Sequence, residues 1–102
     1  MKLLKRLFGP KADFASLVQE GALVVDVRTR EEFKAGHIPG SKNIPLDKIK
    51  NEKNNLRKLN VPVITVCRSG TRSSMAKSIL SGDGIEVYNG GSWLDVKKQL
   101  RS

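Results

Sequence analysis

Apolar residues follow two spacings along the chain, one typical of helices and the other of buried strands. Phe14, Leu17 and Val18 have helical spacing. The apolar run 22–27 contains a single carboxylate, Asp26, as expected for a strand that is buried on both faces. The pattern therefore predicts a helix followed by a strand of a parallel sheet.

A short capped helix and a turn are predicted next. Thr29 and Glu32 form a capping-box pattern, so we expect a helix that runs to Gly36. The Ile-Pro-Gly sequence at 38–40 predicts a turn, and residues 43–45 predict a short extended piece.

A basic helix is predicted after Asp47, which can cap its N-terminus. Its buried residues would be Ile49, Leu56 and Leu59. Its basic residues are Lys48, Lys50, Lys53, Arg57 and Lys58. We interpret this run as a solvated helix face and expect no specific nucleic-acid binding, because aromatics make up only 5% of the chain and no RNP-like or zinc-finger spacing occurs.

The second half of the chain repeats the alternation. A strand is predicted over 61–66, a polar loop over 67–72 and a third strand over 85–88, followed by a turn at 89–91. Between these strands, Met75, Ala76, Ile79 and Leu80 repeat at helical spacing and predict a helix, and the last helix would contain Trp93, Leu94, Val96 and Leu100. Strands alternating with helices predict an α/β fold with a parallel sheet covered on both faces.

Length and composition limit the organisation further. The chain has 102 residues, enough for one domain, and a formal net charge of +9 that would attract anionic ligands and acidic partners. We expect a basic arm over residues 1–10, either packed on the domain or frayed, and a domain over 11–102. No apolar run approaches the ~20 residues that span a bilayer, so no membrane span is expected. A single cysteine forms no intramolecular disulfide and suits a reducing, cytoplasmic setting.

Cys67 stands where chemistry is expected. It follows the strand 61–66, and ligands of open parallel sheets bind outside the carboxyl ends of strands. The helix that begins near Arg72 directs unpaired N–H groups into the loop, and Gly70 lets successive amides converge on one point. These groups, with Arg68 or Arg72, would hold a sulfur anion and lower the pKa of the thiol from about 8.5, which would activate Cys67 as a nucleophile. The alternative is a buried cysteine that acts as a small apolar residue.

Other polar residues are interpreted as structural. His37, the only histidine, is expected to hydrogen-bond nearby backbone in the 38–40 turn; the alternative is a general base. Asp26 and Arg28, with Glu32, are expected to form a cluster of ion pairs and hydrogen bonds at a strand end. One Cys and one His supply no zinc-site spacing, and no cofactor or metal is expected.

Three motifs resemble those of the rhodanese family of sulfurtransferases, over about residues 12–100. They are Val-Asp-Val-Arg at 25–28 with Glu32-Phe33, Gly-His-Ile-Pro-Gly-Ser at 36–41 and Asn-Ile-Pro at 43–45; Cys-Arg-Ser-Gly-Thr-Arg at 67–72; and Tyr-Asn-Gly-Gly at 88–91 followed by Trp93. The resemblance implies a rhodanese-like parallel sheet of about four to five strands with helices on both faces. The chain departs from the family pattern in two respects. Only one residue, Ser92, separates Gly91 from Trp93, where many members have a longer spacing, and the basic arm has no counterpart in the minimal domain.

The resemblance also implies a reaction. Cys67 would take sulfane sulfur from thiosulfate or a persulfide donor and pass it to cyanide or a thiol. A protein sulfur donor or a thioredoxin-like acceptor is a further candidate partner. The substrate-binding residues would be Arg68, Ser69, Gly70, Thr71 and Arg72, and the structural residues near the site Asp26, Arg28, Glu32 and His37.

Two alternatives remain at this stage. One is a non-catalytic or carrier-type binding module. The other is a cysteine phosphatase or arsenate reductase, whose Cys-x5-Arg loop is one residue longer than the segment from Cys67 to Arg72.

Overall fold

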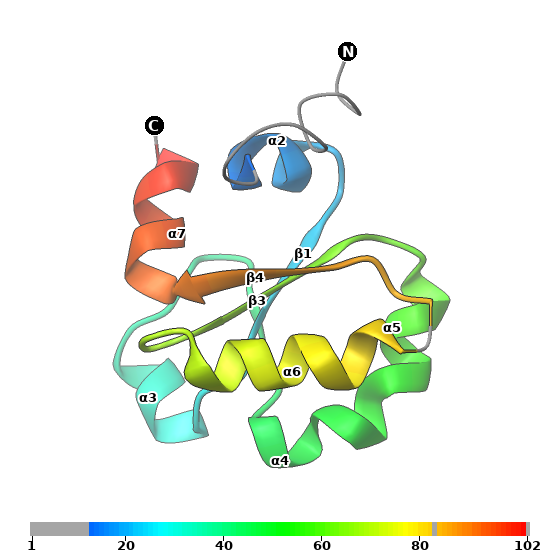
Figure 1. Cartoon of the computed structure of the whole chain (residues 1–102). Coiled ribbons are helices and arrows are strands. Elements are labelled where there is room, and N and C mark those ends of the chain that lie inside the picture. The colour runs from blue at the N-terminus through cyan, green and yellow to red at the C-terminus, as the bar shows by residue number, and fades with distance from the viewer. Residues whose placement is uncertain (1–12, 83, 102) are drawn as a thin grey trace.

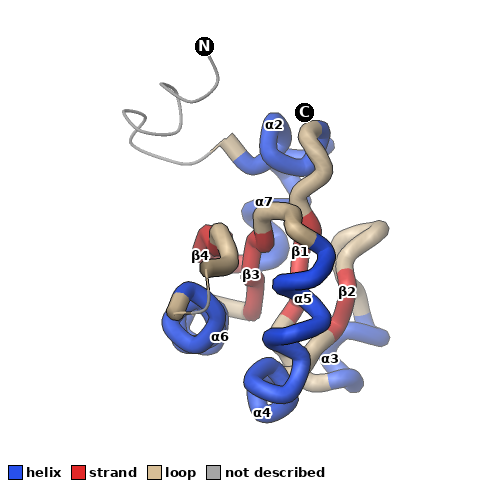
Figure 2. Tube along the Cα trace, turned by 90° about the vertical axis from the view of Figure 1, so that its right-hand side faces the viewer, coloured by secondary structure: helices blue, strands red, loops and turns tan. Residues whose placement is uncertain are grey.

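Four parallel strands form the centre of the molecule. The computed structural model describes residues 13–82 and 84–101, so the predicted basic arm lies outside the described residues. The strands are β1 (Leu23–Asp26), β2 (Lys42–Asn43), β3 (Val63–Cys67) and β4 (Val87–Ser92), and they lie in the order β2-β1-β3-β4 (Figure 2). This is the α/β fold with a parallel sheet that the alternation predicts.

Helices cover both faces of this sheet (Figure 1). They are α2 (Phe14–Gln19), α3 (Arg30–Ala35), α4 (Leu46–Ile49), the 3-10 turn η1 (Lys50–Glu52), α5 (Lys53–Leu59), α6 (Thr71–Ser81) and α7 (Trp93–Arg101). Side chains of one strand point alternately to the two faces. Val25 and Val63 belong to one apolar cluster with Leu80 of α6, whereas Val24 and Ile64 belong to the other.

The helix α3 begins as its sequence predicts. Thr29 Oγ1 accepts the amide hydrogen of Glu32, and the Glu32 carboxylate accepts the amide hydrogen of Thr29, so the capping box is complete. The helix ends at Ala35, with Gly36 as its C-cap. The predicted bounds of this helix are confirmed.

The basic segment differs from the single capped helix that was predicted. It is divided into α4, η1 and α5, and Asp47 lies in the first turn of α4 instead of capping it. A backbone hydrogen bond fixes the start of α4 instead: the amide of Leu46 donates to the carbonyl of Val27, the residue that follows β1. Leu59 was predicted to be buried but is 53% exposed, because it is the last residue of α5, where the chain turns away through Asn60.

The prediction of a turn at residues 89–91 is also wrong, because β4 continues through them to Ser92. A Cβ atom on Gly90 would lie 3.0 Å from the side chains of Ile64 and Val66 and from the carbonyl oxygen of Thr65. The register between β3 and β4 shifts between Thr65 and Val66. The glycine therefore permits close approach at a bulge rather than a chain reversal.

Two further apolar residues lie outside the core. Met75 is 53% exposed, because the buried stripe of α6 runs through Ser73, Ala76 and Leu80 and residue 75 lies to one side of it. Leu94 is similarly exposed near the start of α7. Within residues 13–82 and 84–101, no helix has the length and apolar character needed to cross a membrane.

Candidate active site

Cys67 is the last residue of β3 and lies at the carboxyl end of the sheet. The neighbouring strand β1 ends at Asp26, which pairs in register with Val66, and Ser92 at the end of β4 pairs with Cys67. The helix α6 begins at Thr71, so only three residues separate the strand from the helix. The predicted position of the cysteine, between a strand end and a helix start, is what the structure shows.

The loop closes around the cysteine sulfur. Gly70 has a φ of 109°, a left-handed conformation that favours glycine, and its amide donates to Cys67 Sγ at 2.9 Å. The Ser73 hydroxyl lies 3.5 Å from the same sulfur. Cys67 is only 1% exposed and belongs to an apolar cluster, so its thiol is buried and has these polar contacts as well.

These contacts determine the acidity of the thiol. Burial raises the pKa of Cys67, because an apolar environment favours the neutral form. The side chain of Ser73 and the backbone N–H groups of Ser73, Gly70 and Ser69 lower it, and their combined effect is the larger. The pKa of Cys67 therefore lies below that of an ordinary cysteine, and the arrangement can supply a thiolate nucleophile.

Ser73 was not identified from the sequence. It lies one residue beyond the predicted 67–72 loop, in the first turn of α6, and its side chain is fully buried. Asn89, which accepts a hydrogen bond from Ser73, was assigned to a turn. A polar residue at the first turn of a helix that follows a cysteine loop is the signal that could have indicated Ser73.

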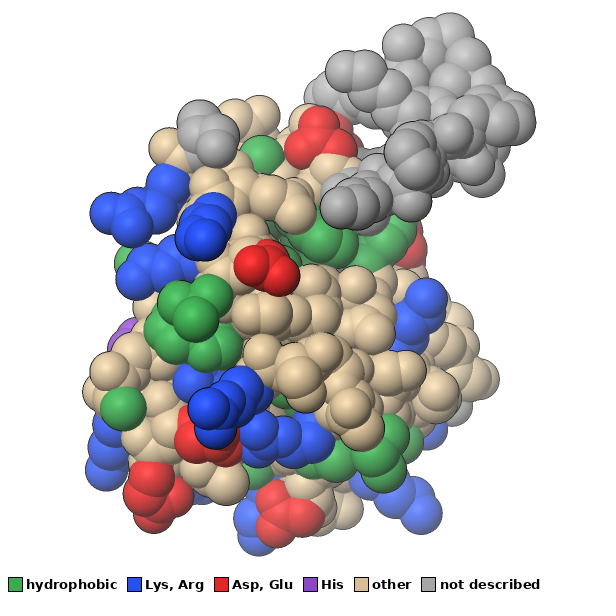
Figure 3. All heavy atoms as spheres, turned by 60° about the vertical axis from the view of Figure 1, so that its left-hand side comes forward, with side chains coloured by type: hydrophobic (Ala, Val, Ile, Leu, Met, Phe, Trp, Pro, Cys, Tyr) green, Lys and Arg blue, Asp and Glu red, His purple; other side chains and the backbone are tan. Residues whose placement is uncertain are grey.

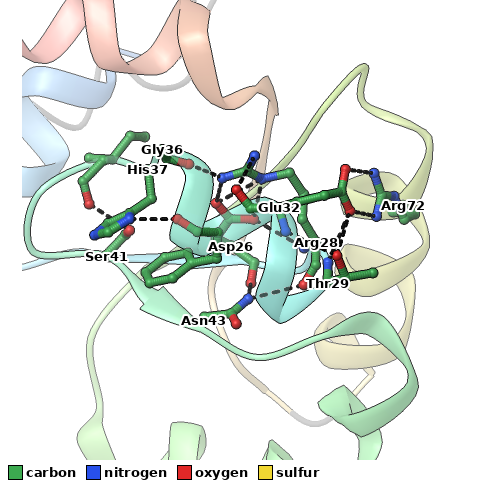
Figure 4. Close-up of polar contacts among 11 residues, drawn as sticks. Asp26, Arg28, Thr29, Glu32, Gly36, His37, Ser41, Asn43 and Arg72 are labelled. Atoms are coloured by element: carbon green, nitrogen blue, oxygen red, sulfur yellow. Dashed lines mark hydrogen bonds and ion pairs between the residues drawn. The ribbon is translucent and has the colours of Figure 1, made fainter.

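Arg72 is held by a carboxylate. Its two terminal nitrogens donate to the two oxygens of Glu32 at 2.7 and 3.0 Å (Figure 4). The hydrogen bond from Arg72, the amide of Thr29 and the charge of Arg72 outweigh the effect of burial and lower the pKa of Glu32 to about 2. The proposed role of Arg72 as an anion-binding residue stays a prediction, and the structure shows that its guanidinium already has a partner.

The other loop residues face outward. Arg68, Ser69 and Thr71 are exposed, in contrast to the cysteine that they follow. Figure 3 shows Lys and Arg side chains, with some Asp and Glu, gathered on the side of the molecule that includes the carboxyl ends of the strands. A small anion that approaches from this side meets a surface rich in positive charge.

A second polar cluster is centred on Arg28. Its guanidinium binds the carboxylate of Asp26, with the shortest distance 2.7 Å, and also donates to the carbonyl oxygens of Gly36 and Glu32 (Figure 4). The guanidinium also lies 4.5 Å from the ring centroid of Trp93. Asp26 and Arg28 thus form the expected ion pair, and Glu32 joins the expected cluster through its carbonyl oxygen, while its carboxylate binds Arg72.

His37 lies beside this cluster, in the turn after α3. Its Nδ1 lies 2.7 Å from the carbonyl oxygen of Phe33, and because a carbonyl only accepts, Nδ1 carries the hydrogen. The imidazole also stacks on the Phe33 ring, with 3.8 Å between centroids. His37 contacts Phe33, whereas the Cys67 sulfur contacts Gly70 and Ser73, so the structure does not bring His37 and Cys67 together as a catalytic pair. Among the described residues, no three His, Cys, Asp or Glu side chains are grouped so that they could hold a metal ion.

Comparison with known proteins identifies a family and several relatives of this chain. The model of the rhodanese-like domain family matches residues 11–94. Thiosulfate sulfurtransferase GlpE of Pseudomonas putida is 36% identical over 72 residues, which are 70% of this chain and 64% of that protein. The protein YrkF of Bacillus subtilis, provisionally named a sulfur carrier protein, is 36% identical over 67 residues, which are 66% of this chain and 36% of that protein.

A solved structure has the same fold. A rhodanese with anions from E. coli superposes with a TM-score of 0.66 and 34% identity, over 74% of this chain and 91% of that one. The chain thus spans less than two thirds of the length of the two curated relatives but most of the length of this structural relative.

Proposed function

Because the chain belongs to the rhodanese-like domain family, we propose that it transfers sulfur through a persulfide on Cys67. The observation that carries the proposal is the set of N–H groups that converge on the buried Cys67 sulfur, led by the amide of Gly70 at 2.9 Å. They stabilise the anion without a neighbouring base, and a thiolate is the nucleophile that sulfur transfer requires.

The reaction proceeds in two displacements. The Cys67 thiolate attacks the outer sulfur of thiosulfate, the sulfur–sulfur bond breaks, and sulfite leaves with the electron pair. Cyanide or an acceptor thiolate then attacks the outer sulfur of the persulfide, and the electron pair returns to Cys67 Sγ. Each step transfers one sulfur atom and restores one anion, so no external oxidant or reductant is needed.

The arginines of the loop have different roles in this proposal. Arg68 is exposed beside Cys67 and attracts the anionic donor. Arg72 keeps its salt bridge with Glu32 and thereby ties the start of α6 to α3. A protein thiol, such as a thioredoxin-like acceptor, or a protein persulfide donor would approach the same basic side of the molecule.

A phosphatase is disfavoured by the same contacts. Its arginine would have to bind a tetrahedral anion, whereas Arg72 is engaged in a bidentate pair with Glu32. The carrier alternative shares the persulfide and differs only in how sulfur is loaded. One experiment therefore has to separate loading by a small molecule from loading by a protein.

The test is mass spectrometry of the chain after exposure to thiosulfate. We expect a gain of one sulfur atom on Cys67, loss of that gain on addition of cyanide, and no gain in Cys67→Ser, whose circular dichroism should match that of the parent chain. Loading only by a cysteine desulfurase would indicate a carrier. No loading from either source, or substantial transfer by Cys67→Ser, would reject the persulfide mechanism.

A separate assay examines the thiol itself. Iodoacetamide should alkylate Cys67 rapidly even below pH 7, because the thiolate is the reactive form. A reactivity midpoint near the ordinary cysteine pKa of about 8.5 would show that the loop does not activate the thiol.

A further inference from the structure

Ser73 contacts the cysteine and hydrogen-bonds to Asn89, and neither residue is among the substrate-binding residues predicted from the sequence. We propose that the Ser73 hydroxyl changes its hydrogen-bond acceptor when Cys67 ionises, and that Asn89 competes with Cys67 for that single hydrogen. Ser73 is then a positioning residue that stabilises the thiolate, and Asn89 limits this stabilisation. The inference rests on the proposed sulfur transfer only for its consequence, since the hydrogen-bond exchange concerns the thiol alone.

The geometry supplies one hydrogen and three acceptors. Ser73 Oγ lies 2.6 Å from Asn89 Oδ1, 3.1 Å from the carbonyl oxygen of Gly70 and 3.5 Å from Cys67 Sγ. The Ser73 side chain is fully buried. A hydroxyl donates once, so these three groups compete for its hydrogen.

The orientation of the Asn89 amide is determined by a second contact. The amide of Gly91 donates to the same Asn89 Oδ1 at 2.9 Å, and only the oxygen of the carboxamide accepts. Asn89 therefore presents an acceptor, not a donor, to Ser73. Because the distance to Asn89 is the shortest of the three, we assign the hydroxyl hydrogen to Asn89 while the cysteine is neutral.

The two protonation states of Cys67 then have different networks. In the thiol, Sγ–H donates to Ser73 Oγ, and the Ser73 hydroxyl donates to Asn89. In the thiolate, Sγ has lost its hydrogen, and rotation of the hydroxyl turns the Ser73 hydrogen from Asn89 to the sulfur. The thiolate gains a hydrogen bond, and Asn89 loses one.

The same exchange accompanies the second half of sulfur transfer. While Cys67 carries a second sulfur, Sγ is a neutral, bonded atom and the hydroxyl remains on Asn89. When an acceptor thiolate takes the outer sulfur, the electron pair returns to Sγ, and the hydroxyl turns to the new anion. Ser73 thus stabilises Cys67 both as a nucleophile and as a leaving group, without moving a proton between residues.

Several charged groups lie near this network and are kept constant in the test. Arg72 lies on α6 with its partner Glu32 of α3, and Arg68 follows Cys67 in the loop. The Asp26–Arg28 pair lies at the end of β1. At the registers of Val66 and Cys67, β4 presents the uncharged Gly91 and Ser92.

The first measurement is the pH dependence of Cys67 alkylation in Ser73→Ala. Loss of a hydrogen bond to a charged group should raise the midpoint by about one to two pKa units. Ser74→Ala is the matched control, because Ser74 is the exposed neighbour on the same helix, and its midpoint should stay at the parent value. Ser73→Thr keeps a hydroxyl and should restore most of the shift. A parent-like midpoint in a folded Ser73→Ala would overturn the proposal.

The second measurement separates competition from simple structural support. Asn89→Ala should lower the midpoint by about half a unit to one unit, because the Ser73 hydrogen is released to the sulfur. Asn89 is exposed, so water can take over its contact with Gly91. A rise in the midpoint, or no change, would contradict the competition.

The double variant Ser73→Ala/Asn89→Ala completes the cycle. Its midpoint should equal that of Ser73→Ala, because Asn89 acts only through the hydroxyl. An equal downward shift from Asn89→Ala in both backgrounds would mean that Asn89 acts on the sulfur directly, which would refute the exchange. Alkylation needs no sulfur donor, so these results test the hydrogen-bond exchange independently of the persulfide experiment.

Discussion

Two neighbouring strand ends hold buried polar groups in opposite ways. At the end of β1, the fully buried carboxylate of Asp26 is bound by the guanidinium and the amide of Arg28. At the end of β3, the buried sulfur of Cys67 is contacted by neutral N–H groups and a hydroxyl, and the nearest donor is the amide of Gly70 at 2.9 Å. The carboxylate of Asp26 is thus paired with a full countercharge, whereas only neutral donors contact the sulfur of Cys67. We expect the first arrangement to contribute to stability and the second to serve the proposed sulfur transfer.

Removing Arg28 should break the first arrangement. Arg28→Met leaves the Asp26 carboxylate buried without its partner and should reduce the free energy of unfolding by about 3–5 kcal/mol. Urea denaturation measures the loss. The double variant Asp26→Leu/Arg28→Met removes both charges and should be more stable than Arg28→Met. A single variant within about 1 kcal/mol of the parent chain, the range of exposed ion pairs, would show that the pair contributes little to stability.

Changing Gly70 should break the second arrangement. Gly70→Ala places a side chain at a φ of 109°, which costs about 1–2 kcal/mol and shifts the amide that donates to Cys67. We expect slower alkylation at neutral pH and a higher midpoint. Gly40→Ala is the control, since its φ of 84° imposes similar strain where a Cβ atom meets nothing within 4 Å. The two variants should lose similar stability, and only Gly70→Ala should change the thiol. Equal thiol reactivity in both would argue against a role for the amide.

Changing Glu32 should have the smallest effect and should sharpen the comparison. The pKa of Glu32 is about 2, below its usual value of 4.5, so the carboxylate contributes stability above pH 4.5 and loses it as the pH falls toward 2. Both side chains of its salt bridge with Arg72 are about one-third exposed, so Glu32→Gln should cost about 0–1 kcal/mol at neutral pH. The difference from the parent chain should narrow over this acidic range. A constant difference down to pH 2 would show that the charge of Glu32 is not the cause.

Local signals predicted the first half of the fold well. The capping box of Thr29 and Glu32 and the buried strand that contains Asp26 involve residues close in sequence, so their patterns determine the structure directly. Residues 89–91 were misassigned because glycines indicate turns and close approaches alike. Only the packing of Gly90 against Ile64 and Val66 distinguishes the two.

The site shows the same limit. Cys67 and Gly70, three positions later in the same loop, could be identified because strand, loop and helix follow one another in the chain. The Glu32–Arg72 pair joins residues 40 positions apart, and the Ser73–Asn89 contact joins residues 16 positions apart. Contacts between residues so far apart depend on how the strands and helices are arranged in space. The order of residues in one sequence does not reveal that arrangement.

The cation–π contact between Arg28 and Trp93 places the fluorescent indole of Trp93 near the end of β1. Trp93 is the only tryptophan of the chain, and its indole lies against Arg28 and beside Gly36, where a Cβ atom would be 3.1 Å from the ring. Its emission therefore reports the packing of α7 on α3 from a position outside the cysteine loop. An optical signal intrinsic to the chain can thus record loosening of this corner while the thiol is titrated separately.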